Sequence, residues 1–164
     1  MKMFGTIVAL LLAPILAQGL VYGPVAADNA ALMNGNFVVE VEHKDFTTAT
    51  TNTAQTIELF SVDDTMGVEV VAMLLNRTFE EEANAAHNST SITVGDGGDP
   101  DRFLTATELN VNGTEVKIKY GTGTQNVYTS ADTVDLVVTP SALDAVSELD
   151  KGKVTIYFRV YKVD

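Results

Sequence analysis

Alternation of apolar and polar side chains is the feature that most constrains the fold of this sequence. It is clearest near the C-terminus, in residues 153–163, and recurs at 37–41 and 115–119. One side of the C-terminal run carries four apolar residues: Val154, Ile156, Phe158 and Val160. Successive side chains of a strand point to opposite faces, whereas a helix repeats every 3.6 residues. The period of two therefore predicts half-buried β-strands.

Strand patterns of this kind continue through the chain after an apolar head. They are expected at residues 36–43, 56–62, 67–75, 90–94, 108–111, 115–120, 133–139 and 153–163. Asn112-Gly113 predicts a type I′ hairpin, and residues 141–149 predict a short helix or turn. Since strands do not alternate with helices, the fold class is all-β: an antiparallel β-sandwich, jelly-roll-like, over residues 36–164. Residues 1–35 are expected to form an apolar N-terminal arm or leader.

The head has three possible roles. Residues 1–27 carry a single charge, Lys2, whereas all 22 acidic residues follow. Lys2, the apolar run 4–16 and the small residues Val25-Ala26-Ala27 fit a cleaved signal peptide. A membrane anchor is disfavoured because Pro14, Gln18 and Gly19 interrupt the span. The third role is an uncleaved arm that docks into a partner, through the interface residues Phe4, Ile7, Leu11, Ile15, Leu20 and Tyr22.

Composition excludes several classes of function. The net charge is −12 and the basic residues are scattered, which argues against binding to nucleic acid or to an anionic membrane. The chain has no cysteine, and so no disulfide framework or thiolate metal site. His43 and His87 are isolated from residues that could orient or activate them. We expect no enzyme activity and no cofactor, and we expect both histidines to be dispensable surface residues.

The loop at residues 95–101 is the one cluster of acidic residues that suggests a metal. Asp96, Asp99 and Asp101 lie within six residues, and Ca²⁺ prefers several oxygen ligands from a tight loop. The spacing is not that of an EF-hand, so a turn with solvated acids is preferred and no metal is assigned. Gly97 and Gly98 permit positive φ angles that a branched residue resists. Phe103 and Leu104 are expected to anchor the loop on the core.

The same loop carries a family resemblance. The segment Ser91-Ile-Thr-Val-Gly-Asp-Gly-Gly-Asp-Pro-Asp-Arg-Phe-Leu104 resembles the "GD-x-GDPDRFL" loop of small structural proteins of tailed bacteriophages, of the head decoration or cement kind. Thr105-Ala-Thr107, the Thr-rich stretch 46–60 and the ending 131–163 resemble the same family. The resemblance covers residues 45–163. The apolar leader of 27 residues departs from the short arm with which these proteins begin.

The resemblance implies a β-sandwich that works by multivalent contact on a virion. The expected partners are the major capsid protein or other virion proteins, and the expected state is a homo-oligomer, a trimer, on the capsid surface. The alternative is a secreted or membrane-anchored β-sandwich, such as an adhesin, in which residues 1–27 are the signal peptide or anchor.

Overall fold

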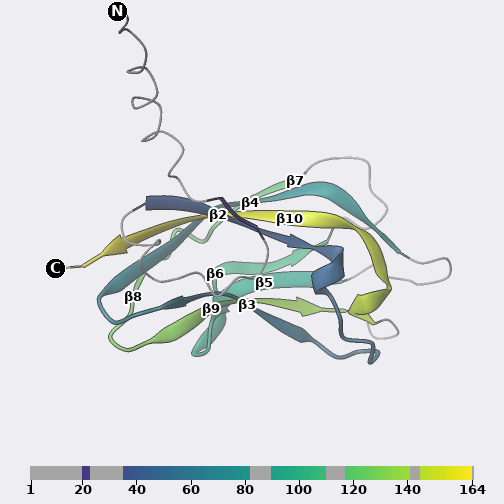
Figure 1. Cartoon of the computed structure of the whole chain (residues 1–164), viewed down its shortest axis with the longest axis horizontal. Coiled ribbons are helices and arrows are strands. Elements are labelled where there is room, and N and C mark those ends of the chain that lie inside the picture. Colours follow the sequence, from purple (N-terminus) through teal and green to yellow (C-terminus); the bar gives the residue numbers. More distant parts are fainter. Residues whose placement is uncertain (1–19, 23–34, 82–89, 110–116, 141–144, 164) are drawn as a thin grey trace, which may run out of the picture.

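The computed structural model describes residues 20–22, 35–81, 90–109, 117–140 and 145–163, which form two packed sheets (Figure 1). Sheet A contains, in spatial order, β1 (Leu20–Tyr22), β2 (Gly35–Glu42), β10 (Leu149–Lys162), β4 (Met66–Glu81) and β7 (Lys117–Tyr120), and β8 (Asn126–Val127) also pairs with β4. Sheet B contains β3 (Gln55–Val62), β9 (Asp132–Thr139), β5 (Ser91–Asp96) and β6 (Asp99–Glu108). Two 3-10 turns complete the described part: η2 (His43–Asp45) and η3 (Val146–Glu148).

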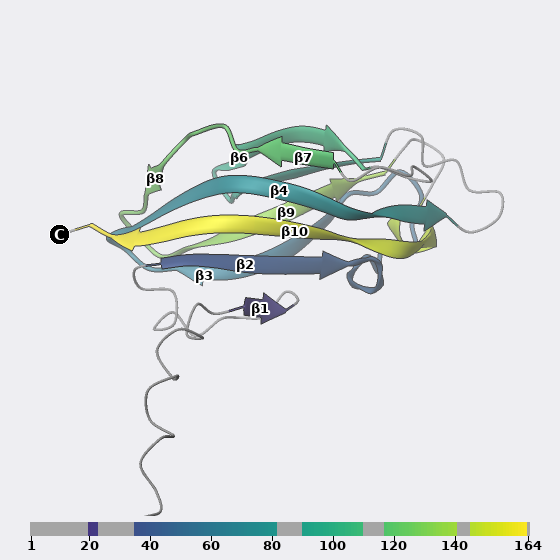
Figure 2. The same ribbon diagram turned by 90° about the horizontal axis from the view of Figure 1, so that it is seen from above.

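The strand order is that of a jelly roll. Apart from the short β1 and β8, the strands run in the order β2-β10-β4-β7 in sheet A and β3-β9-β5-β6 in sheet B, so that the chain passes repeatedly between the two layers. Neighbours pair antiparallel throughout, except that β1 pairs parallel to β2. Figure 2 shows β1 and β7 at opposite edges of sheet A. The predicted all-β sandwich is confirmed.

The core lies between the sheets and follows from the alternation. In β10 the apolar face predicted from the sequence, Val154, Ile156, Phe158 and Val160, is buried. Sheet B contributes Phe60, Phe103 and Leu136 from the other side, all fully buried. The rings of Phe60 and Phe158 meet edge to face, with centroids 5.0 Å apart and planes at 83°, and so join the two sheets directly.

Two local predictions differ from the structure. The loop at residues 95–101 is a tight β-hairpin, because Asp96 pairs with Asp99 and both strands continue to the turn. The strands on either side of Asn112-Gly113 do not pair with each other: β6 belongs to sheet B and β7 to sheet A. The Asn-Gly turn itself, and residues 141–144 of the predicted helix, lie outside the described residues; the part of 141–149 that is described contains η3.

Candidate functional site

Asp96, at the tip of β5, is saturated by donors from the protein itself. Its Oδ1 accepts hydrogen bonds from the backbone N–H groups of Gly98 (3.1 Å) and Asp99 (2.9 Å) and from Arg102 Nη2 (3.3 Å). Its Oδ2 accepts from Arg102 Nε (2.6 Å), the Tyr128 hydroxyl (3.0 Å) and Asn126 Nδ2 (3.4 Å). The side chain is 2% exposed. A carboxylate holds about four lone-pair sites, so Asp96 has none left for a cation.

Electrostatics keep this carboxylate ionised. Burial alone would raise the pKa of Asp96, but hydrogen bonds from Arg102 and Tyr128 and the charge of Arg102 outweigh burial and lower that pKa below its ordinary value. Burial and the neighbouring Asp96 charge raise the pKa of the Tyr128 hydroxyl, which therefore stays a donor. Asp101 is exposed, and no cluster of three potential metal ligands forms among the residues that the structure describes. The acids of this loop do not converge.

The glycine that the hairpin requires is Gly95. A Cβ at Gly95 would lie 2.0 Å from the Asp99 carbonyl oxygen and 2.4 Å from the Pro100 carbonyl carbon, both backbone atoms that cannot yield. At Gly97 and Gly98 an added Cβ would meet only side-chain atoms, at 3.4 Å or more. Neither has a positive φ, because the positive-φ glycines of the described chain are Gly123 and Gly152. The positive φ that Gly97 and Gly98 permit is thus not used in the hairpin; close backbone approach at Gly95 constrains the motif.

The Asp96 cluster joins the two sheets at one end of the sandwich. Tyr128 lies just after β8, and its backbone bonds to the start of β4: Tyr128 N–H donates to Met66 O (2.8 Å). The connection from β7 to β8 is held on β6, since Thr122 N–H donates to Phe103 O and its hydroxyl to Arg102 O, both at 2.9 Å. Phe103 and Leu104 are fully buried, which confirms that they anchor the loop. The resulting clamp fixes β7 and β8 against the hairpin.

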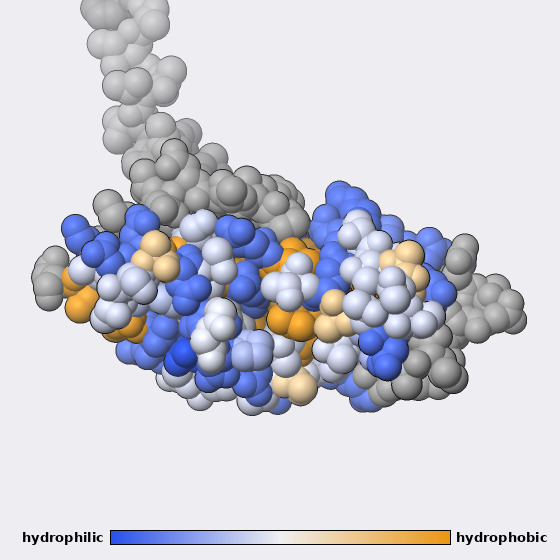
Figure 3. Space-filling view, turned by 90° about the horizontal axis from the view of Figure 1, so that it is seen from below, coloured by the Kyte–Doolittle hydropathy of each residue, from blue (hydrophilic) through white to orange (hydrophobic). Residues whose placement is uncertain are grey.

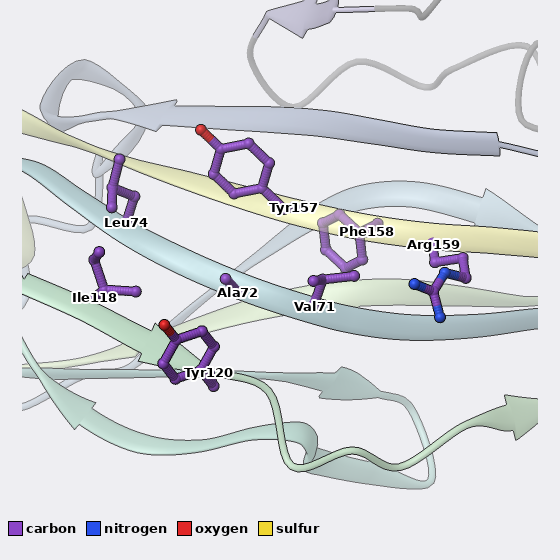
Figure 4. A pocket seen from close by; sticks show the side chains of 8 residues that line it. All are labelled: Val71, Ala72, Leu74, Ile118, Tyr120, Tyr157, Phe158 and Arg159. Atoms are coloured by element: carbon purple, nitrogen blue, oxygen red, sulfur yellow. The ribbon is translucent and has the colours of Figure 1, made fainter.

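The exposed apolar surface of the molecule lies on sheet A. Five large apolar side chains of the described chain are exposed, and all belong to strands of that sheet: Val71, Ile118, Tyr120, Val127 and Tyr157. Four of them line an open groove of about 470 Å³ on the outer face of the sheet. Figure 4 shows Tyr157 on β10 along one side, Ile118 and Tyr120 on β7 along the other, and Ala72 and Leu74 of β4 between them. We call this the outer groove.

The opposite face of the molecule is different. Figure 3 shows the outer face of sheet B, which is mostly hydrophilic with an orange strip near its middle. In the described strands of sheet B no large apolar side chain reaches the exposure of those on sheet A. On sheet A, by contrast, the side chains of Ile118 and Tyr120 are 57% and 72% exposed, respectively. Exposed large apolar side chains that gather on one sheet mark a contact surface for a protein, a membrane or a ligand.

Two features of the local sequence produce the outer groove. In β7 the residues Lys117-Ile118-Lys119-Tyr120 alternate so that the apolar pair faces outward, in line with Leu74 and Ala72, while Lys119 pairs with the buried Met73. β4 also has a bulge opposite Tyr157 and Phe158 of β10. These two residues pair with Ala72 and Val70, so that Val71 is an extra residue, and Val71 is exposed. The sequence could predict these two features only if the buried face of each strand were already known.

Paired charges close one end of the outer groove. Arg159 Nη1 donates to Glu69 Oε2 at 2.9 Å, and Gln125 Nε2 donates to the same oxygen at 3.3 Å. Among the described residues that line the groove, Arg159 is the one with a charged side chain, and its charge is thus paired at the rim. The groove has the chemistry of a contact for apolar side chains.

The remaining predicted residues lie elsewhere. Leu20 and Tyr22 are the first and last residues of β1, at the far edge of sheet A, whereas Phe4, Ile7, Leu11 and Ile15 lie outside the described residues, as does His87. His43 begins η2 and is half-buried; within the described chain no acid or serine hydrogen-bonds its imidazole. None of the described helices has the length and apolar character needed to cross a membrane.

Comparisons with known proteins give distant similarities. No protein-family model and no curated protein matches the chain. One similar solved chain, from a structure described as "Cyanophage Pam1 capsid asymmetric unit", is 22% identical with a TM-score of 0.46, over 94% of this chain and 100% of that chain. Another, described as "Bacillus endospore appendages form a novel family of disulfide-linked pili", is 16% identical with a TM-score of 0.33, over 85% and 97%. At these values neither carries an argument about this chain, whose function is argued from its own residues.

Proposed function

We propose that this chain is a structural protein of a bacteriophage virion, which decorates or cements the capsid surface through repeated protein contacts. The observation that carries the proposal is the confinement of all exposed large apolar side chains in the described chain to sheet A. Such a face is unfavourable on a free monomer and favourable in an assembly, where protein covers it. The sequence resemblance of residues 45–163 to decoration proteins supports a virion as the assembly.

The described part of the chain suits a contact protein. In the 95–101 hairpin the carboxylate of Asp96 is used for folding and Asp101 is exposed, and the charge at the rim of the outer groove is paired. Proposed partners are the major capsid protein or other virion proteins, with this chain as a homo-oligomer, a trimer. Because a shell repeats each site many times, contacts that are individually weak reach high avidity. We propose no catalytic role and no nucleic-acid binding.

The test is binding to particles that lack the protein. Full-length chain added to such particles should co-sediment with them at a fixed number of copies per particle. The heat-induced release of their DNA should then move to higher temperature. Particles that neither bind the chain nor gain heat resistance would rule out the decoration role. An unrelated sandwich of similar acidity serves as the control for nonspecific adsorption.

The signal-peptide pattern of residues 1–27 supports a second candidate, a secreted β-sandwich such as an adhesin. Intact mass of the protein from its native source separates the two. A mass of 17.5 kDa means that the apolar head is retained, as an arm requires. A mass that begins at Asp28 means export.

A further inference from the structure

We propose that the apolar N-terminal arm of one copy, residues 4–16, fills the outer groove of a second copy, and that this contact holds the homo-oligomer together. The inference rests on the proposed function, in which the chain works as part of an assembly. Each copy gives its arm to one neighbour and receives the arm of another in its outer groove.

The two surfaces match in chemistry. Residues 4–16 contain no charged side chain: Phe-Gly-Thr-Ile-Val-Ala-Leu-Leu-Leu-Ala-Pro-Ile-Leu. The outer groove offers Val71, Leu74, Ile118 and the two tyrosines, and its one charge, Arg159, is held by Glu69 at the rim. Exposure of the arm or of the groove to water is unfavourable, and contact between them removes the apolar surface of both from water.

Sheet A places the start of β1 level with the groove. Leu20 pairs with Val38, Val38 with Tyr157, Tyr157 with Ala72, and Ala72 with Tyr120, so one row of residues crosses the whole sheet. At about 4.8 Å per strand, the row runs about 14 Å from β1 to β4. The arm thus joins the sheet at the height of the groove, on the opposite edge.

The direction of β1 favours a neighbouring copy over the arm's own domain. β1 runs parallel to β2, and β2 begins at Gly35, three residues before Val38. A chain continued backward from Leu20 along β1 would pass the start of β2 within about 10 Å. To reach its own groove the arm would have to reverse its direction before Leu20 and cross β2 toward β10. Thirteen extended residues span up to about 45 Å, enough to reach a second copy.

The symmetry of such a contact agrees with a ring. The arm and the groove are different surfaces, so their contact is heterologous and closes into a ring when the rotation between copies permits. In a closed ring every arm and every groove is occupied, as expected for a trimer.

The test uses full-length variants and the oligomeric mass by light scattering. The arm variant carries Ile7→Asp and Leu11→Asp; the groove variant carries Ile118→Asp and Tyr120→Asp. The control is Val127→Asp, which changes an apolar residue of sheet A that is 44% exposed but does not line the groove. Wild type and control should form the same discrete multiple of 17.5 kDa. Each of the other two should dissociate at concentrations at least about tenfold higher than wild type, as loss of an interface anchor requires.

Mixing the two variants tests whether the arm occupies the groove of another copy. The groove variant keeps an intact arm and the arm variant an intact groove, so together they should form a 1:1 complex that neither forms alone. If mixing gives no complex, the arm does not occupy a groove in another copy and the inference is overturned. Circular dichroism checks that each variant is folded; if the groove variant is not, Tyr120→Ser, at a side chain 72% exposed, takes its place.

The result is separable from the proposed function. A wild type that is monomeric in solution yet binds to particles overturns the arm exchange and leaves the decoration role intact. A wild type that assembles through arm and groove but does not bind to particles supports the arm exchange and overturns the decoration role.

Discussion

We expect Asp96 to contribute more to stability than any other side chain of the hairpin, because its carboxylate hydrogen-bonds to residues of both sheets. Asp96→Asn removes the charge that pairs with Arg102, whose guanidinium side chain is 28% exposed. We expect this variant to lower the free energy of unfolding by about 3 kcal/mol. Chemical denaturation measures it. The control Asp101→Asn, at an exposed acid, should stay within about 0.5 kcal/mol of wild type; an equal loss in both variants would contradict the assigned role.

The contribution of Asp96 depends on pH. Its pKa in the folded protein is lowered from the ordinary value of 3.8, with burial opposed by the stronger effects of Arg102 and Tyr128. An acid of this kind contributes stability above its unfolded pKa and loses it as the pH falls through the folded value. The difference in melting temperature between wild type and Asp96→Asn should therefore be full at pH 7 and shrink below about pH 3.8. A difference that is constant with pH would mean that the charge is not involved.

Gly95 and Gly97 give a matched pair of substitutions within one turn. Gly95→Ala places a methyl group 2.0 Å from a backbone oxygen, so β5 or β6 must move. We expect a loss of about 2–4 kcal/mol, in the range of severe single substitutions. Gly97→Ala meets only a side-chain oxygen at 3.4 Å and should be nearly neutral. Thermal unfolding of the two variants checks this, and the reverse ranking would show that the turn is constrained by φ.

At the scale of elements, sheet A combines a strong centre with a weak edge. β10 is hydrogen-bonded on both sides, to β2 and β4, whereas β1 spans three residues at an edge. Amides in β10 should therefore exchange with solvent deuterium only on global unfolding, and those of β1 many times faster. Hydrogen exchange read by mass spectrometry tests the order. Equal protection of β1 and β10 in a dilute monomer would contradict it.

The sequence predicts the elements better than their partners. The alternation in β10 identifies its buried face because the apolar residues from Val154 to Val160 follow a period of two, although Thr155 is buried as well. The same reasoning pairs the strands around Asn112-Gly113, which the structure assigns to different sheets, because a turn signal is local whereas pairing is decided by the whole jelly roll. The outer groove escaped prediction since the Val71 bulge and the outward face of β7 depend on tertiary packing.

At the scale of the whole molecule, charge and assembly oppose each other. Each copy carries a net charge of −12, so copies repel at low ionic strength. If an apolar arm holds them together, raising the salt concentration screens the repulsion and leaves the contact itself intact. Self-association of the full chain should therefore tighten between low and moderate salt, as measured by sedimentation equilibrium. Weaker association at higher salt would mean that ion pairs between copies hold the oligomer.

The parallel pairing of β1 with β2 gives the molecule a mechanical property. Tension on the chain at Leu20 that acts along the strand axis tends to slide β1 along β2, across the evenly spaced, slanted hydrogen bonds of this parallel pair. The bonds are then loaded together in shear and do not open one by one. If the arm is held by a neighbouring copy, as proposed above, a pull on it is therefore shared by the backbone hydrogen bonds of β1.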